Sequence, residues 1–148
     1  MDYFLQEGPL RPGRAAAALI LVEDRYLLQL RDQKPGIFFP GHWGLFGGAC
    51  DGSETPEQAL RREMQEELGI TVSNLRHVTD FTFTFGRTGA VARHFFEIQI
   101  SSSLLGSLVL GEGSAMRTFA AAEILNLPRV VPYDSFALWL HASGQVAA

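Results

Sequence analysis

Two continuous apolar runs stand near the start of the chain. Residues Ala15–Val22 (AAAALILV) carry no polar side chain, and Tyr26–Arg31 (YLLQLR) resumes the apolar pattern after Glu23 and Asp24. Short apolar runs on either side of a polar turn are typical of paired strands that are buried on at least one face. The pattern therefore predicts two neighbouring strands of a sheet.

This pattern is interrupted by a segment rich in turn residues. Residues 32–42 (DQKPGIFFPGH) contain two Pro-Gly dipeptides, which favour a loop. The following Trp43–Gly48 (WGLFGG) predicts a brief extended segment that ends in a glycine pair.

A helix is predicted from Pro56 to Leu68. Thr55 is a suitable N-cap, Pro56 suits the first helical position, and Gln58 completes a capping-box pattern. Gly69 is suited to the left-handed position that ends a helix.

The second half of the chain predicts more strands and then helices. Two segments rich in β-branched and aromatic residues flank a Gly-Arg-Thr-Gly turn, and a further short strand and two helices follow. The expected strands are Val78–Phe85, Val91–Ile100 and Met116–Phe119, and the expected helices are Ala120–Asn126 and Ser135–Ala142, the second capped by Asp134. Such an order predicts a layered α/β or α+β fold. We expect one domain over residues 1–148, with residues 1–14 as a loose lead-in.

Composition and charge narrow the class of protein. A net charge of −4 at pH 7 disfavours a surface that coats nucleic acid. The longest apolar run is too short to span a bilayer, and the N-terminus lacks the pattern of a signal peptide, so we expect a cytoplasmic protein without a membrane partner. The single cysteine, Cys50, excludes an intramolecular disulfide and is expected to be a small packing residue.

The predicted helix crowds three carboxylates onto one side. At about 100° per residue, Glu63, Glu66 and Glu67 fall within one arc beside the apolar arc of the helix. Like charges at this spacing cost a few tenths of a kcal/mol per pair. A hard divalent cation would remove that cost, and Mg²⁺ or Mn²⁺ suits an all-oxygen site. Arg62 flanks the arc, where it can neutralise part of the charge or hold Glu54 in a bidentate contact.

The glycines before this helix add to the predicted site. Gly47 and Gly48 permit a tight turn that exposes main-chain carbonyls as further oxygen ligands, and Gly47 is our candidate for such a ligand. The chemistry that this arrangement indicates is metal-assisted hydrolysis at phosphorus.

The segment Gly48–Ile70 resembles the signature of the Nudix hydrolase family, G-x5-E-x7-R-E-U-x-E-E-x-G-U, where U is aliphatic. Every fixed position is filled, by Gly48, Glu54, Arg62, Glu63, Met64, Glu66, Glu67, Gly69 and Ile70. The resemblance implies an α/β/α sandwich with a mixed sheet.

The resemblance also implies roles for these residues. Glu63, Glu66 and Glu67 would be metal ligands, with Glu63 or Glu66 close to the attacking water, while Arg62 would orient the glutamates and Glu54 and Gly48 would support the site. The segment Leu110–Gly113 is similar to a downstream loop of the family, which makes Glu112 a candidate for metal binding or base catalysis.

Residues outside the signature are candidates for the substrate. Phe39 and Trp43 belong to an aromatic loop that either packs as a satellite core or stacks on a nucleobase. Arg31 either contacts a phosphate or forms a surface ion pair. The four histidines show no zinc-ligand spacing, although His94 could face the cleft.

We therefore expect a Mg²⁺-dependent pyrophosphohydrolase that cleaves a nucleoside diphosphate linked to another group. The roomy aromatic loop slightly favours nucleotide sugars or related dinucleotides. A nucleoside triphosphate house-cleaning pyrophosphohydrolase and a non-catalytic nucleotide-sensing module are the alternatives. A homodimer is common in proteins that resemble this one.

Overall fold

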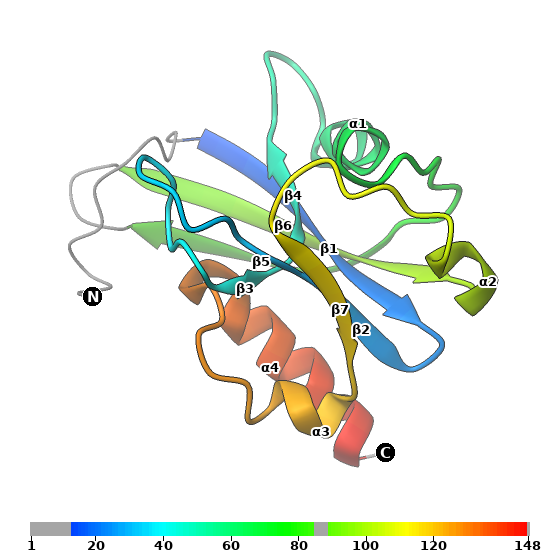
Figure 1. Cartoon of the computed structure of the whole chain (residues 1–148). Helices are drawn as coiled ribbons and strands as arrows, with labels where there is room; N and C mark the ends of the chain where they lie inside the picture. Colours follow the sequence, from blue (N-terminus) through cyan, green and yellow to red (C-terminus); the bar gives the residue numbers. More distant parts are fainter. Residues whose placement is uncertain (1–12, 85–88, 148) are drawn as a thin grey trace.

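A seven-stranded mixed sheet forms the centre of the computed structural model, which describes residues 13–84 and 89–147 (Figure 1). Five strands follow the order β3-β2-β1-β6-β5, while β4 pairs with β1 and β7 pairs with β2. The strands are β1 (Gly13–Val22), β2 (Arg25–Leu30), β3 (Trp43–Gly44), β4 (Phe46–Ala49), β5 (Arg76–Thr84), β6 (Ala90–Ile100) and β7 (Ala115–Phe119).

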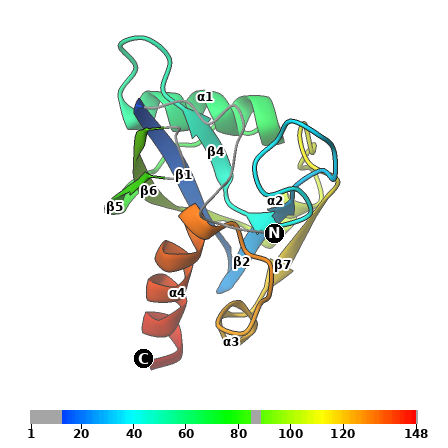
Figure 2. The ribbon, with the colours of Figure 1, turned by 90° about the vertical axis from the view of Figure 1, so that its left-hand side faces the viewer.

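Helices cover both faces of this sheet. Helix α1 (Pro56–Leu68) lies on one face, and α3 (Ala121–Ile124) and α4 (Pro132–Ala147) lie on the other (Figures 1 and 2). A short helix, α2 (Ser102–Leu105), follows β6. The predicted α/β/α sandwich with a mixed sheet is confirmed.

Strand β1 is buried on both faces because it lies in the middle of the sandwich. It runs parallel to β6 and antiparallel to β2 and β4. The side chains of Ala16, Ala18 and Ile20 pack with α1. Those of Ala17 and Leu19, on the other face of the strand, pack with α4. A strand with two buried faces shows a continuous apolar run, which explains the pattern in the sequence.

Helix α1 begins and ends where the local sequence predicts. The Thr55 hydroxyl accepts a hydrogen bond from the Gln58 amide, and the Gln58 side chain accepts one from the Thr55 amide. Gly69 ends the helix with φ of 68° and ψ of 24°, a left-handed conformation that glycine adopts without a Cβ penalty. Leu60, Met64 and Leu68 are buried against the sheet, which leaves the carboxylate arc at the rim.

Several predicted boundaries shift because strand pairing continues beyond the apolar pattern. Gly13 and Arg14 were placed in the loose lead-in but pair with β6, so β1 begins at Gly13. Strand β5 begins at Arg76 rather than Val78, since Arg76 is paired with Glu97. The rest of the lead-in, Phe85 and the turn residues 86–88 lie outside the described residues.

Two further predictions are corrected by tertiary contacts. The extended segment Trp43–Gly48 is divided into β3 and β4, because the intervening Leu45 donates its amide to the Asp134 carboxylate at 3.0 Å. Asp134 is therefore not the N-cap of the last helix: α4 begins at Pro132, and Asp134 lies buried in its first turn. Helix α3 is also shorter than the predicted Ala120–Asn126.

Candidate active site

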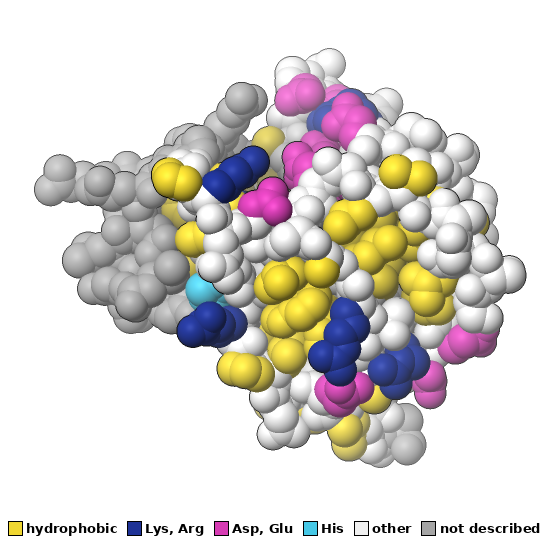
Figure 3. Space-filling model, viewed as in Figure 1, with side chains coloured by type: hydrophobic (Ala, Val, Ile, Leu, Met, Phe, Trp, Pro, Cys, Tyr) yellow, Lys and Arg dark blue, Asp and Glu magenta, His cyan; other side chains and the backbone are white. Residues whose placement is uncertain are grey.

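The carboxylates of α1 differ in how deeply they are buried. Glu67 is only 2% exposed, and its Oε2 accepts a 3.2 Å hydrogen bond from the Gly47 amide of β4. The Glu63 side chain is mostly buried, whereas that of Glu66 is 57% exposed. The three side chains therefore lead from β4 to the solvent. Gly47 and Gly48 lie within β4, paired with Ala17 and Ala16 of β1, and do not form the tight turn expected from the sequence. Acidic side chains gather over α1 and the loop before it, at the top of Figure 3.

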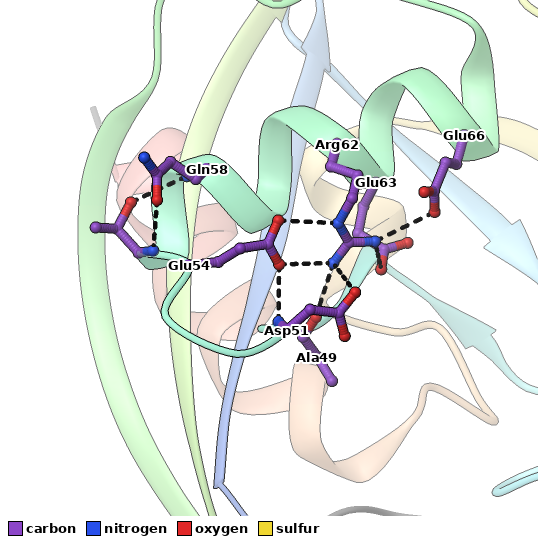
Figure 4. A network of polar contacts seen from close by, with 8 residues as sticks. Ala49, Asp51, Glu54, Gln58, Arg62, Glu63 and Glu66 are labelled. Carbon is purple, nitrogen blue, oxygen red and sulfur yellow. Dashed lines mark hydrogen bonds and ion pairs between the residues drawn. The ribbon is translucent and has the colours of Figure 1, made fainter.

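Arg62 links the loop before α1, the end of strand β4 and the carboxylates of α1 (Figure 4). Its Nε and Nη2 each donate a 3.0 Å hydrogen bond to Glu54, and its Nη1 donates to Glu63 at 3.0 Å and to Glu66 at 3.2 Å. Its Nη2 also donates to the Ala49 carbonyl at 3.1 Å. Arg62 therefore holds Glu54 in the bidentate contact expected from the sequence and contacts Glu63 and Glu66, while its role in orienting the glutamates stays a prediction.

Gly48 allows α1 to approach the end of β4 closely. A Cβ atom at Gly48 would lie 2.4 Å from Glu63 Oε1, closer than real contacts allow. The missing side chain therefore provides the space in which the Glu63 carboxylate lies.

The loop that carries Glu112 is hydrogen-bonded to the C-terminal end of α1. The Gly111 amide donates to the Glu67 carbonyl at 2.7 Å, and the Val109 amide donates to the Leu68 carbonyl at 3.2 Å. These bonds satisfy carbonyls that the helix itself leaves unpaired at its C-terminus. They also bring Glu112 close enough to Glu67 for its charge to act on that carboxyl group.

The proton affinities in this cluster reflect its burial and its crowding. Burial, together with the negative charges of Glu63 and Glu112, raises the pKa of Glu67 to about 9. Burial also raises the pKa of Glu63, although hydrogen bonds from Glu67 and Arg62 act in the opposite direction. At the edge of the cluster, the Arg62 guanidinium and the Asp51 amide lower the pKa of Glu54. Without a cation, the two inner carboxyl groups disfavour full ionisation.

The donor set fits a hard divalent cation. Glu63, Glu66 and Glu67 offer carboxylate oxygens on one side of α1, and Glu112 lies beside Glu67. Burial, and for Glu67 also the nearby negative charges, opposes ionisation of the Glu63 and Glu67 carboxyl groups, whereas a bound Mg²⁺ or Mn²⁺ would favour their ionised form as oxygen ligands. Gly47 contributes its amide to Glu67, and metal binding through its carbonyl stays a prediction.

A cavity of about 230 Å³ extends from this site across the sheet. Its wall includes Gly47, Gly48 and Glu112 together with aromatic and charged side chains. The other side chains of the wall that bear on binding are Arg31, Phe83, Arg93, Tyr133 and Asp134. Gly48 of the signature therefore shares this cavity with aromatic side chains, whereas Glu63, Glu66 and Glu67 are not part of its wall.

Arg93 and Asp134 form a buried ion pair in the wall of this cavity. Arg93 Nε donates to Asp134 Oδ1 at 2.8 Å, and the two side chains are 10% and 1% exposed. The Arg93 guanidinium also lies 4.6 Å from the centre of the Tyr133 ring, within the range of a cation–π contact. The sequence analysis missed Arg93, Tyr133 and Phe83. A signal was present, because Arg93 occupies an apolar position between Val91 and Phe95 of β6.

The three predicted substrate residues occupy different surroundings. Arg31 lines the cavity and donates from Nε to the Phe38 carbonyl at 2.7 Å. Phe39 has no exposed surface and packs with Phe38, Val131 and Tyr133, as its core alternative predicts. Trp43 packs edge-on against Phe119, with ring centres 5.0 Å apart, and is not in the cavity wall. Substrate contacts of Phe39 and Trp43 stay untested predictions.

Cys50 and His94 also lie apart from the cavity wall. Burial raises the pKa of the Cys50 thiol, which opposes formation of a reactive thiolate.

Within the described ranges, no helix combines the length and hydrophobicity needed to cross a bilayer.

The chain belongs to the Nudix hydrolase family, because the model of the NUDIX domain matches residues 11–143. Its fold also agrees with that of a MutT NUDIX hydrolase from Burkholderia pseudomallei. The TM-score is 0.71 at 26% identity, over 86% of this chain and 96% of that chain.

Two curated relatives are similar over part of their length. The nucleoside triphosphatase NudI of Escherichia coli O139:H28 (strain E24377A / ETEC) is 39% identical over 75 residues, which is 51% of this chain and 52% of that protein. The oxidized purine nucleoside triphosphate hydrolase of Danio rerio is 40% identical over 79 residues, or 53% of this chain and 49% of that protein. These matches span about half the length of the curated relatives.

Proposed function

We propose that this protein is a divalent-metal-dependent pyrophosphohydrolase that acts on nucleoside triphosphates. Water would cleave an internal phosphoanhydride bond, so that a triphosphate yields a nucleoside monophosphate and pyrophosphate. The observation that carries the proposal is the cavity whose wall combines Gly47, Gly48 and Glu112 with the aromatic side chains of Phe83 and Tyr133.

The carboxylates of α1 and the cavity beside them suit the two parts of a nucleotide. Glu63, Glu66 and Glu67 would hold Mg²⁺ or Mn²⁺, which would neutralise phosphate oxygens when bound. Arg62 would keep Glu63 and Glu66 in position through the hydrogen bonds described above. Glu63, Glu66 and Glu112 remain candidates for the group that accepts a proton from the attacking water.

The aromatic part of the cavity wall would bind the nucleoside. Tyr133 and Phe83 offer aromatic surface for a base, and Arg31 offers a positive charge between the pocket and the loop of Glu112. Flat rings suit any nucleobase, since each base has a π-face. The ion pair between Arg93 and Asp134 would fix the shape of this pocket.

The triphosphate alternative is preferred to the nucleotide sugar. Both similar curated relatives are named for hydrolysis of nucleoside triphosphates. The preference for a nucleotide sugar depended on the roomy loop at Phe39, yet Phe39 is buried in a satellite cluster and does not widen the cavity. A non-catalytic sensor is less well supported, because every glutamate of the signature is present and lies at the site.

The proposal is tested with a panel of substrates in the presence of Mg²⁺. Ribo- and deoxyribonucleoside triphosphates, including oxidised purines, are assayed with inorganic pyrophosphatase, and nucleoside diphosphate sugars with alkaline phosphatase, by phosphate release. We expect turnover of triphosphates that is lost in Glu67→Gln. Turnover of the sugars alone would reject the triphosphate assignment, and nucleotide binding without turnover would favour the sensor.

A further inference from the structure

Two histidines and an aspartate meet at the edge of the sheet, on β5 and β6. Asp80 Oδ1 is hydrogen-bonded to His77 Nε2 and to His94 Nδ1, each at 2.7 Å. One nitrogen of each imidazole and one oxygen of the carboxylate all lie within 4.8 Å of one another. None of these residues lines the nucleotide cavity.

An irregularity in strand pairing produces this cluster. Asp80 lies directly opposite His94, while the pairing shifts between His77 and Thr79, so that His77 lies opposite Phe96. In a regular strand, residues three apart point to opposite faces. The extra residue at the shift turns His77 to the face of Asp80 and His94, as expected for a β-bulge. The rings of His77 and Phe96 form an edge-to-face contact with their centres 5.4 Å apart, and this contact helps to hold His77 in that orientation.

We propose that His77, Asp80 and His94 form a binding site for a transition-metal dication of the Zn²⁺ class. Imidazole nitrogens with one carboxylate are ligands that favour Zn²⁺, Co²⁺ or Ni²⁺ over Mg²⁺. This site is separate from the glutamates of α1, whose oxygen ligands favour Mg²⁺ or Mn²⁺.

The separations suit a tetrahedral ion after small side-chain rotations. With metal–ligand bonds of about 2.0–2.2 Å, neighbouring ligand atoms of a tetrahedral zinc site lie roughly 3.4 Å apart. Two of the present distances, at 2.7 Å, are hydrogen bonds that the ion would replace. His77 and Asp80 are each half exposed, so the ion has access from solvent and these side chains have room to rotate.

His94 limits the affinity of the site. Its Nε2 is buried and has no hydrogen-bond partner in the described structure. When Nδ1 binds a metal, Nε2 carries the proton, and a ligating histidine usually donates that proton to an acceptor. Loss of such an acceptor typically weakens metal binding by about 10- to 100-fold. We therefore expect a dissociation constant on the order of micromolar, weaker than in structural zinc sites with four ligands.

Metal binding would link β5, at the edge of the sheet, to β6. Strand β5 is the last strand in the sheet order and is paired with β6. An ion shared by His77, Asp80 and His94 would link these strands independently of backbone hydrogen bonds. Zn²⁺ should therefore raise the melting temperature, since a ligand that binds the folded state stabilises it.

The test is a metal titration of the chelator-treated full chain in saturating Mg²⁺. Zn²⁺ binding is measured by calorimetry and Co²⁺ binding by visible absorption, where intense d–d bands indicate tetrahedral coordination. The same titrations in Glu67→Gln remove competition from the carboxylate site. We expect one Zn²⁺ per chain, a rise in melting temperature, and at least a tenfold loss of affinity in His77→Ala and in Asp80→Asn.

Asp24→Asn is the matched control, since Asp24 is exposed in the turn between β1 and β2. It should bind Zn²⁺ as the unchanged chain does. Equal Zn²⁺ affinity in His77→Ala, Asp80→Asn and the unchanged chain would overturn the proposal, because the ion would then bind elsewhere. Failure of the Glu67→Gln protein to bind Zn²⁺ or Co²⁺ more tightly than about 100 µM, a free energy near −5.5 kcal/mol, would overturn it as well.

Discussion

The Arg62 guanidinium donates two hydrogen bonds of 3.0 Å, from Nε and Nη2, to the two carboxylate oxygens of Glu54. Glu54 precedes α1 and Arg62 lies in its middle, so this contact fixes the entry loop against the helix. A lysine cannot reproduce the planar pair of donors. We expect Arg62→Lys to lower kcat/KM for a nucleoside triphosphate by at least tenfold, measured by pyrophosphate release.

The matched control is Arg117→Lys on β7. Arg117 forms an exposed ion pair with Glu123 at 3.3 Å, and such pairs contribute about 0–1 kcal/mol. Activity of Arg62→Lys equal to that of Arg117→Lys would contradict a positioning role for Arg62.

Gly48→Ala tests the space that Glu63 occupies. The new Cβ would lie 2.4 Å from Glu63 Oε1, and the flexible carboxylate end would have to move. We expect Mg²⁺ affinity, measured by calorimetry, to fall at least tenfold while the protein still folds. Gly106→Ala is the control, since a Cβ there has no neighbour within 4 Å among the described residues. Unchanged Mg²⁺ affinity in Gly48→Ala would argue against Glu63 as a ligand.

The raised pKa of Glu67 predicts how stability depends on pH. Its pKa rises from 4.5 to about 9 on folding in the absence of metal. As the pH rises through this window, the unfolded chain releases its proton before the folded chain does, so the free energy of unfolding decreases. That contribution to stability is complete below pH 4.5 and is lost toward pH 9. We therefore expect chelator-treated protein to be less stable at pH 8 than at pH 5.

Glu67→Gln should remove this dependence. At pH 8 in a chelator, we expect the variant to be more stable than the unchanged chain by on the order of 2 kcal/mol, or about 4–8 °C in melting temperature. At pH 4 the two proteins should have similar free energies of unfolding. At pH 8, added Mg²⁺ should stabilise only the unchanged chain. Glu57→Gln, at an exposed position of the same helix, serves as the control. A Glu67→Gln variant that is the less stable protein at pH 8 would refute the assignment.

Asp134→Asn tests the ion pair in the cavity wall. The asparagine can still accept from the Leu45 amide, but it leaves the buried Arg93 without its counter-charge. Removal of one partner of a buried ion pair typically costs about 3–5 kcal/mol. We expect a loss of that size in urea denaturation, together with a higher KM for the nucleotide. A stability equal to that of the exposed control Asp24→Asn would contradict this interpretation.

The sequence by itself determined helix α1, with its arc of glutamates, and the family. The N-cap at Thr55, the stop at Gly69 and the arc of glutamates depend on residues within a few turns of one another, and such local patterns are visible in one dimension. The bidentate contact between Arg62 and Glu54 was also accessible, because only eight positions of the chain separate them.

The tertiary structure alone decided the aromatic part of the cavity wall and the cluster on β5 and β6. Arg93 and Asp134 are 41 positions apart, and they meet because the start of α4 packs on the face of the sheet to which the Arg93 side chain of β6 points. His77 joins Asp80 and His94 because the strand pairing shifts by a residue, which reverses the face to which a side chain points. A periodic pattern in the sequence does not specify where such a shift occurs, since it depends on how the neighbouring strand is placed.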